Sequence, residues 1–187
     1  MKKIYCVRHA ITDEHVNARI NPVMGFKDIG LNEEGIKEAN KLGGKLKRTK
    51  IEGILCSNLK SSVETAQIIN QYLAVPLYIS DLYRERDQGE YKAKELKEIY
   101  ERNPQFSITT KGKGREDLRS FMNRTKIAFH NIENDFNWST CLLVSHKGFL
   151  QTMTATCIGI KPSNWYLCEI RAFIYSDGKW IQTNIEC

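Results

Sequence analysis

Short apolar runs of strand length alternate along this chain with longer segments in which apolar residues recur at helical spacing. This alternation is typical of α/β folds, where helices connect parallel strands and cover both faces of the sheet. We therefore expect a three-layer α/β sandwich with a mainly parallel central sheet. The expected strands cover residues 4–7, 53–56, 75–79, 141–144, 167–175 and 179–185. The last two runs are joined by Ser176-Asp177-Gly178, which is a hairpin signal.

Helix signals fill the intervals between these strands. Asn32 is a good N-cap, and the segment after it carries apolar residues at positions 36, 39, 42 and 46. A second helix is expected after Ser57, with apolar residues at positions 63, 66, 69 and 73. Helical patterns return at 93–100 and 116–132, and another helix begins near Gly148. We interpret about 91–135 as a small helical cap inserted into a single domain that spans 1–187.

Two of the expected strands run directly into a histidine. Residues 4–7 lead into Arg8-His9, and residues 141–144 lead into Ser145-His146. The carboxyl ends of parallel strands form the crevice where ligands bind in open α/β sheets, so the two imidazoles can converge although they are far apart in sequence. With an arginine beside the first histidine, the sequence predicts a phosphate site at this edge of the sheet.

The composition, with 41% hydrophobic and 27% charged residues, is that of an ordinary globular protein of one domain. No apolar stretch approaches a membrane span and no signal-peptide core develops, so we expect a cytoplasmic protein that does not contact membranes. The six cysteines include no Cys-x-x-Cys pair, which favours reduced structural thiols over zinc binding. A net charge of +6 favours anionic partners, but the basic residues are scattered and no aromatic-interleaved patch supports nucleic-acid binding.

Five short blocks of this sequence, in order, resemble the motifs of the histidine phosphatase superfamily, also called phosphoglycerate mutase-like. The first, Arg8-His9-Ala10-Ile11-Thr12, is similar to Arg-His-Gly-x-Thr. The others are the helix start at 28–35, Ser57-Asn58-Leu59 with Thr65-Ala66, the acid-bearing segment 84–89 and the second-histidine segment 144–148. Such an ordered set is much more specific than an isolated Arg-His pair.

The resemblance implies phosphoryl transfer through a histidine. A neutral imidazole is a good in-line nucleophile for phosphorus, and a carboxyl group with a raised pKa can protonate the leaving oxygen. The family pattern assigns the nucleophile to His9, the acid to Glu85 and a second donor to His146. By the resemblance Thr12 contacts the phosphate, and we expect further phosphate contacts from Arg8 and from the helix start at Lys147 and Gly148. The family pattern requires neither a metal nor another cofactor. Contacts to the rest of the substrate are expected from Asn17, Arg19, Gly25 and Arg86.

Two positions depart from the family pattern. Ala10 replaces a glycine, which is a mild change if the backbone there does not need a positive φ. Ser61 falls where the family's second phosphate-binding arginine belongs, and the loss of one such donor typically costs about 10²–10³ in rate. We expect another cation to take its place, with Lys147 the first candidate and Arg19 the second.

The loop 10–29 is long for a plain connection, which is typical of a functional segment. Which of His15, Asn17 and Arg19 touches the substrate stays open. Histidines in loops and helical patterns are ordinarily structural, so His15 and His130 are given no catalytic role.

The sequence thus favours a metal-independent phosphomonoesterase that hydrolyses a small phosphorylated metabolite through a phosphohistidine on His9. Two alternatives remain: a degenerate family member that binds phosphorylated ligands or partners with little turnover, and a phosphoglycerate-type mutase. Sugar phosphates, nucleotide-like monophosphates and phosphoproteins all remain open as substrates. The oligomeric state is not indicated by any sequence feature.

Overall fold

The computed structural model describes residues 2–13, 15, 28–89 and 114–185, and a sheet of six strands forms the centre of this part of the chain. The strand order is β3-β2-β4-β1-β5-β6. Of these, β3, β2, β4 and β1 are mutually parallel, whereas β5 and β6 are paired antiparallel. The mainly parallel sheet is therefore confirmed. The strands are β1 (Lys3–Arg8), β2 (Gly53–Ser57), β3 (Leu77–Ser80), β4 (Thr140–Ser145), β5 (Ile170–Ser176) and β6 (Lys179–Thr183).

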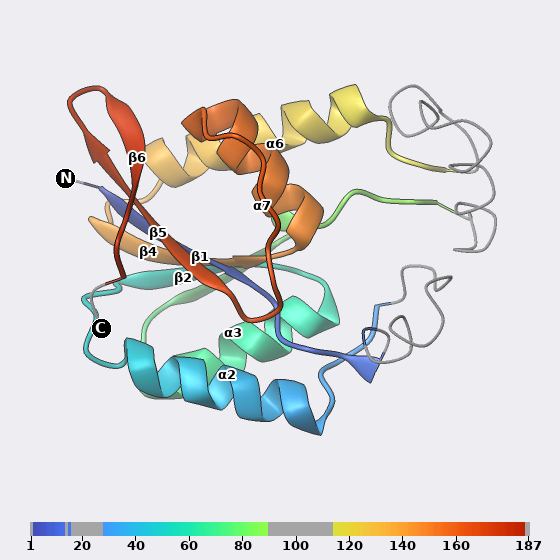
Figure 1. Cartoon of the computed structure of the whole chain (residues 1–187), viewed down its shortest axis with the longest axis vertical. Coiled ribbons are helices and arrows are strands. Elements are labelled where there is room, and N and C mark those ends of the chain that lie inside the picture. The colour runs from blue at the N-terminus through green and yellow to red at the C-terminus, as the bar shows by residue number, and fades with distance from the viewer. Residues whose placement is uncertain (1, 14, 16–27, 90–113, 186–187) are drawn as a thin grey trace.

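Helices cover both faces of the sheet, as Figure 1 shows. On one face lie α2 (Glu33–Leu46) and α3 (Lys60–Leu73), and on the other lie α6 (Leu118–Asn134) and α7 (Lys147–Met153). Successive residues of a strand point to opposite faces, so Ile54 packs into one apolar cluster and Leu55 into the other. The central strands consequently read as continuous apolar runs, and the expected three layers are confirmed.

The expected cap at 91–135 is wrong over its second half. The helix expected at 116–132 exists as α6, but Phe121, Ala128, Phe129 and Ile132 are buried in the cluster that covers one face of the sheet. Their spacing gives α6 an apolar stripe broad enough to serve as a structural layer. The first half of the expected cap lies outside the described residues. In the described part of the chain, no helix combines the length and apolarity needed to cross a membrane.

The beginning of α2 lies against the chain segment that follows His9. Asn32 is the N-cap, and its side chain accepts a hydrogen bond from the Gly35 amide at 2.9 Å. Ile36 belongs to the apolar pattern that predicted this helix, but it is 45% exposed, and Gly35 occupies the inner position. A Cβ on Gly35 would lie 2.1 Å from the Ile11 carbonyl oxygen. The glycine therefore permits a close helix-to-loop approach that a larger residue prevents.

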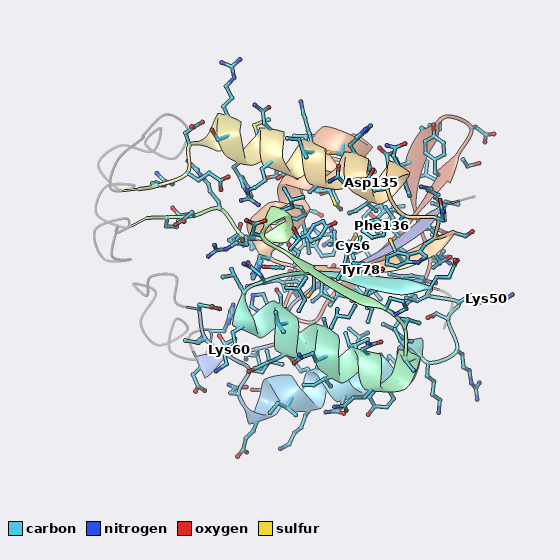
Figure 2. All side chains as sticks on the ribbon, turned by 180° about the vertical axis from the view of Figure 1, so that it is seen from behind. Cys6, Lys50, Lys60, Tyr78, Asp135 and Phe136 are labelled. Atoms are coloured by element: carbon cyan, nitrogen blue, oxygen red, sulfur yellow. The ribbon has the colours of Figure 1, made fainter. Side chains whose placement is uncertain are left out.

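The two edges of the sheet are finished differently. At the β3 edge, Tyr78 packs edge-on against Phe136, which lies in the chain segment just beyond α6. Their ring centroids are 5.4 Å apart (Figure 2). At the other edge, β5 and β6 form the expected hairpin, and Asp177 and Gly178 both adopt left-handed conformations with φ of 52° and 77°. Two adjacent residues with positive φ match the tight turn that the strand twist favours, so this prediction is confirmed.

Candidate active site

Two neighbouring parallel strands bring the histidines together. β1 pairs with β4 so that Arg8 lies opposite Ser145, and a histidine follows on each strand. The His9 amide donates to the Ser145 carbonyl at 2.9 Å, and the ring centroids of His9 and His146 are 5.0 Å apart. The two residues are only 6% and 2% exposed. The convergence expected from the strand ends is confirmed.

A cavity of about 250 Å³ opens beside these histidines. It is walled by the end of β1, the beginning of α3, the loop after β3 and the beginning of α7. Polar and ionisable side chains dominate this wall, in contrast to the apolar clusters that flank the sheet. The lining residues in the described part of the chain are Arg8, His9, Thr12, His15, Asp28, Ile29, Leu59, Ser61, Glu85, His146 and Lys147.

The His9 side chain is held as a neutral imidazole. Its Nδ1 lies 2.9 Å from the Ala10 carbonyl oxygen, which can only accept, so Nδ1 carries the proton and Nε2 keeps a lone pair. Burial lowers the His9 pKa well below its ordinary value, and the nearby His146 and Arg8 lower it further. Ala10 is not among the described residues with positive φ, so replacement of the family's glycine is tolerated as expected. This state suits a nucleophile at neutral pH.

His146 is fixed by two serine hydroxyls. Its Nε2 lies 2.9 Å from Ser57 Oγ and 3.1 Å from Ser62 Oγ, and all three groups are buried. Burial lowers the His146 pKa to about 3, with Arg8 the next largest cause. Reading the sequence did not assign a role to either serine, because a serine at a strand end or helix start also fits simple capping.

Glu85 is half-buried, and its carboxyl group lies on the wall of the cavity. Its Oε2 accepts from the Gly148 amide at 2.7 Å and its Oε1 from the Arg86 amide at 2.9 Å. Burial raises the Glu85 pKa, while these two amide bonds and the charges of Arg8 and Arg124 oppose that rise. A carboxylate offers about four lone-pair sites, so two remain for a proton or a ligand. Burial is the largest of these causes, so the protonated form is favoured more than in a freely exposed glutamate.

Gly148 has a different role from the expected phosphate contact. Its amide donates to Glu85, and a Cβ on Gly148 would lie 2.3 Å from Glu85 Oε1. The glycine is therefore needed for close approach of the Glu85 carboxyl to the first turn of α7. The expectation for Gly148 is corrected from phosphate binding to support of Glu85.

Arg8 is anchored at one end of its guanidinium group. Nη1 donates to the Trp165 carbonyl at 2.8 Å, while Nη2 faces His15 Nε2 at 3.0 Å. The buried Nε has no hydrogen-bond partner among the described residues, and each of the two Nη groups keeps a second N–H that these two contacts do not use. Trp165 was not predicted, since a main-chain carbonyl leaves no signal in the sequence.

His15 was expected to be structural, but it lies on the cavity wall. A guanidinium only donates, so His15 Nε2 accepts from Arg8 and its Nδ1–H donates to Thr12 Oγ1 at 2.7 Å. The His15 ring centroid lies 5.2 Å from that of His9. His130, by contrast, is exposed on α6 and outside the cavity, in agreement with its expected lack of a role.

The remaining predicted residues divide into three groups. Thr12 and Lys147 line the cavity, as does Ser61. Arg86 does not, because its Nε donates to the Glu116 carbonyl at 2.9 Å on the side of α6, so the expected substrate contact is wrong. Asn17, Arg19 and Gly25 lie outside the described residues. In the described ranges, no group of three or more His, Cys, Asp or Glu side chains is arranged to hold a metal ion.

Comparison with known proteins relates nearly the whole chain to one family. It is 35% identical over 162 residues to a Bacillus subtilis protein named uncharacterized phosphatase PhoE, covering 87% of this chain and 80% of that one. It is 25% identical over 193 residues to a Salmonella choleraesuis protein named probable phosphoglycerate mutase GpmB, covering 97% and 88% of the two chains. The crystal structure of the alpha-ribazole phosphatase from Shigella flexneri has the same fold, with a TM-score of 0.82 at 17% identity over 97% of this chain and 94% of that one. The model of the histidine phosphatase superfamily (branch 1) matches residues 4–185, and this chain belongs to that superfamily.

Proposed function

We propose that this protein is a phosphomonoesterase that needs no metal and hydrolyses a small phosphorylated metabolite through a phosphohistidine on His9. One observation carries the proposal: a neutral buried imidazole and a half-buried carboxyl group with a raised pKa line the same small cavity, beside an arginine. This combination supplies a nucleophile, an acid and an anion-binding donor, which phosphoryl transfer requires.

In the first step, His9 Nε2 attacks phosphorus and the ester P–O bond breaks. The Glu85 carboxyl group gives its proton to the departing alkoxide, which leaves as an alcohol. Arg8 and Lys147 stabilise the negative charge on the equatorial phosphoryl oxygens. The lone pair on Nε2 is available because Nδ1–H is bonded to the Ala10 carbonyl.

In the second step, water attacks the phosphohistidine and the P–N bond breaks. Glu85, now a carboxylate, takes a proton from the attacking water, and inorganic phosphate leaves. The same residue therefore serves as acid and then as base, which returns His9 to its neutral state.

A mutase is the alternative that the similarity to GpmB favours. A mutase would transfer the phosphoryl group back to an organic acceptor rather than to water, and its turnover would depend on a bisphosphate primer. Release of inorganic phosphate without such a primer distinguishes hydrolysis from transfer. Tight phosphate binding without any turnover would indicate a degenerate binding protein instead.

The proposal is tested by hydrolysis of p-nitrophenyl phosphate between pH 5 and 8 with excess EDTA. We expect turnover that EDTA leaves unchanged, because the groups assigned to each step are protein side chains. The measurement is release of p-nitrophenol before and after chelation, with a metal-dependent phosphatase as the positive control for EDTA. Loss of activity that an added divalent cation restores would contradict the proposal.

Lys147 is proposed to supply positive charge where Ser61 leaves the cavity without an arginine. Both residues line the cavity. Lys147→Ala should lower kcat/KM by at least about tenfold, because one preorganised donor to the transferring phosphoryl group is lost. Lys60→Ala is the matched control, since the Lys60 side chain is 61% exposed and its Nζ lies 4.0 Å from Glu64. Equal rates for the two variants would remove Lys147 from the phosphate site.

A further inference from the structure

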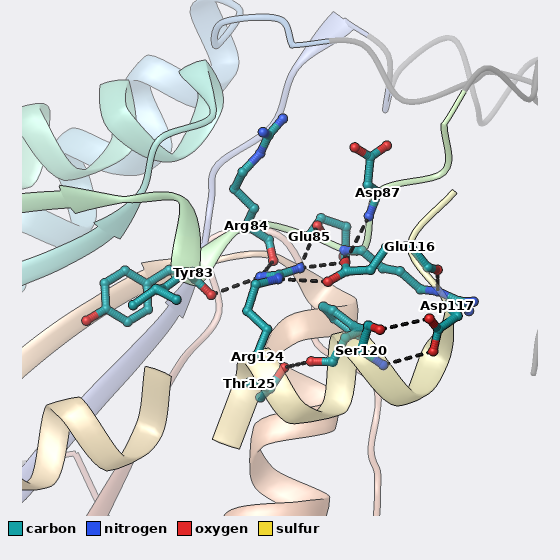
Figure 3. Close-up of polar contacts among 12 residues, drawn as sticks. Tyr83, Arg84, Glu85, Asp87, Glu116, Asp117, Ser120, Arg124 and Thr125 are labelled. Carbon is teal, nitrogen blue, oxygen red and sulfur yellow. Dashed lines mark hydrogen bonds and ion pairs between the residues drawn. The ribbon is translucent and has the colours of Figure 1, made fainter. Parts of the chain in front are cut away.

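An arginine on α6 contacts the loop that carries Glu85, and its guanidinium group is fully bonded. Arg124 Nη1 donates to the carbonyls of Leu82 at 2.9 Å and Arg84 at 3.0 Å. Nη2 donates to the Glu85 carbonyl at 3.3 Å and to Glu116 Oε2 at 2.7 Å, and Nε donates to Glu116 Oε1 at 2.9 Å. A guanidinium has five N–H donors, and these five bonds use them all (Figure 3).

Glu116 holds the same loop from its other side. Its carboxylate receives the Arg124 guanidinium bidentately, and its Oε2 also accepts from the Asp87 amide at 3.3 Å. The Glu116 amide donates to the Asp87 carbonyl at 3.0 Å, and the Glu116 carbonyl accepts from Arg86 Nε at 2.9 Å. Residues 82–87 are therefore bonded to α6 and to the segment just before it along most of their length.

Glu85 is consequently held at both ends. Its main-chain carbonyl is bonded to Arg124 of α6, while its carboxyl group is bonded to the Gly148 amide in the first turn of α7. The Arg124 and Glu116 side chains are half-buried, at 20% and 17% exposed, so their ion pair is only partly screened by water. The loop is also bonded to β4, because the Ser145 hydroxyl donates to the Tyr83 carbonyl at 2.7 Å. A shift of the loop beyond this bond would move the Glu85 carboxyl group relative to the cavity.

We infer that Arg124 is a positioning residue for Glu85. Glu116 orients the planar guanidinium group, and the guanidinium holds the loop so that the Glu85 carboxyl group reaches the leaving-group oxygen. The inference rests on the proposed function, in which Glu85 is the general acid. The role depends on the shape of the guanidinium and not only on its charge. A lysine has one ammonium with three donors and cannot reach three carbonyls and a bidentate carboxylate in one plane.

Leaving-group dependence separates this role from a general structural one. Departure of p-nitrophenolate needs little protonation, whereas departure of an alkoxide from glycerol 2-phosphate needs an acid. The quantity to compare is kcat/KM, because it covers only the steps up to transfer of the phosphoryl group to His9. A misplaced acid should therefore impair the alkyl ester selectively.

The experiment compares four variants on p-nitrophenyl phosphate and glycerol 2-phosphate. These are Arg124→Lys, Glu116→Gln, the reference Glu85→Gln, and Arg119→Lys as a control on the exposed face of the same helix. We expect Arg124→Lys to lower kcat/KM on the order of 10²-fold for the alkyl ester, the cost of a displacement of about 1 Å, and less than about threefold for the aryl ester. Glu116→Gln should give the same pattern with a smaller amplitude, and Arg119→Lys should change neither value.

The outcomes distinguish failure of the Arg124 positioning role from failure of the proposed function. If Glu85→Gln is selective for the alkyl ester but Arg124→Lys lowers both esters equally, or neither, the positioning role is wrong. If Glu85→Gln shows no selectivity, the acid assignment of the proposed function fails first. If circular dichroism shows that Arg124→Lys is not folded, Glu116→Gln provides the same test, because it leaves Arg124 in place. Selective loss of kcat/KM on the alkyl ester would then support the positioning role, and equal loss on both esters, or no loss, would contradict it.

Discussion

Replacement of His9 by alanine should lower kcat for p-nitrophenyl phosphate by at least about four orders of magnitude, the usual cost of removing a nucleophile. The Nε2 lone pair of His9 is available for attack on phosphorus, because the ring proton is on Nδ1, bonded to the Ala10 carbonyl, and burial favours the neutral ring. The other two histidines of the cavity are engaged elsewhere: His146 Nε2 is bonded to Ser57 and Ser62, and His15 Nε2 accepts from Arg8.

The measurement is steady-state release of p-nitrophenol by His9→Ala and by His130→Ala, the exposed histidine on α6. The control should retain the rate of the unaltered protein. Substantial turnover by His9→Ala, with unchanged circular dichroism, would show that another group attacks phosphorus.

Glu85→Gln is expected to have the second largest effect. Glutamine keeps the shape of the side chain, but its one oxygen can accept from only one of the Gly148 and Arg86 amides, and it cannot deliver a proton. General acid catalysis typically contributes 10²–10⁴-fold, so kcat/KM for glycerol 2-phosphate should fall by about that factor. The aryl ester should be affected much less, and equal losses on both esters would indicate that Glu85 is only structural.

The pH dependence provides an independent check on the same residue. Glu85 must be protonated to act as an acid, and burial raises its pKa, so activity on the alkyl ester should fall only as pH rises through that raised pKa. The low pKa of His9 keeps the nucleophile neutral well below pH 6.5, so the acid limb lies at lower pH. In Glu85→Gln the alkaline limb should be absent.

The sequence predicted the layers well because the relevant signals are local. Uninterrupted apolar runs mark the central strands, and Asn32 and Asp177-Gly178 mark a helix start and a turn through their own backbone preferences. The cap was misjudged because an amphipathic stripe predicts that α6 is a helix but not what it packs on. Burial of Phe121 and Phe129 against the sheet is a tertiary property.

The candidate site was predicted in part for a similar reason. His9, His146 and Glu85 carry chemistry in their side chains and stand in recognisable motifs, so they could be assigned. Gly148 and Arg86 could not, because their roles depend on which partner lies nearest, and in the structure that partner is Glu85 for one and Glu116 for the other. His15 was missed for the opposite reason: a single loop histidine gives no signal until folding places it beside Arg8.

The central claim is that the phosphoryl group passes through His9, and trapping the phosphoenzyme tests it most directly. The protein would be mixed with p-nitrophenyl phosphate in EDTA, quenched in alkali within milliseconds to seconds, and digested for mass spectrometry under conditions that preserve phosphohistidine. Our account predicts an acid-labile, alkali-stable phosphate on the peptide that contains His9, absent from His9→Ala. A phosphate on a different residue, or turnover with no phosphoenzyme at any quench time, would contradict it.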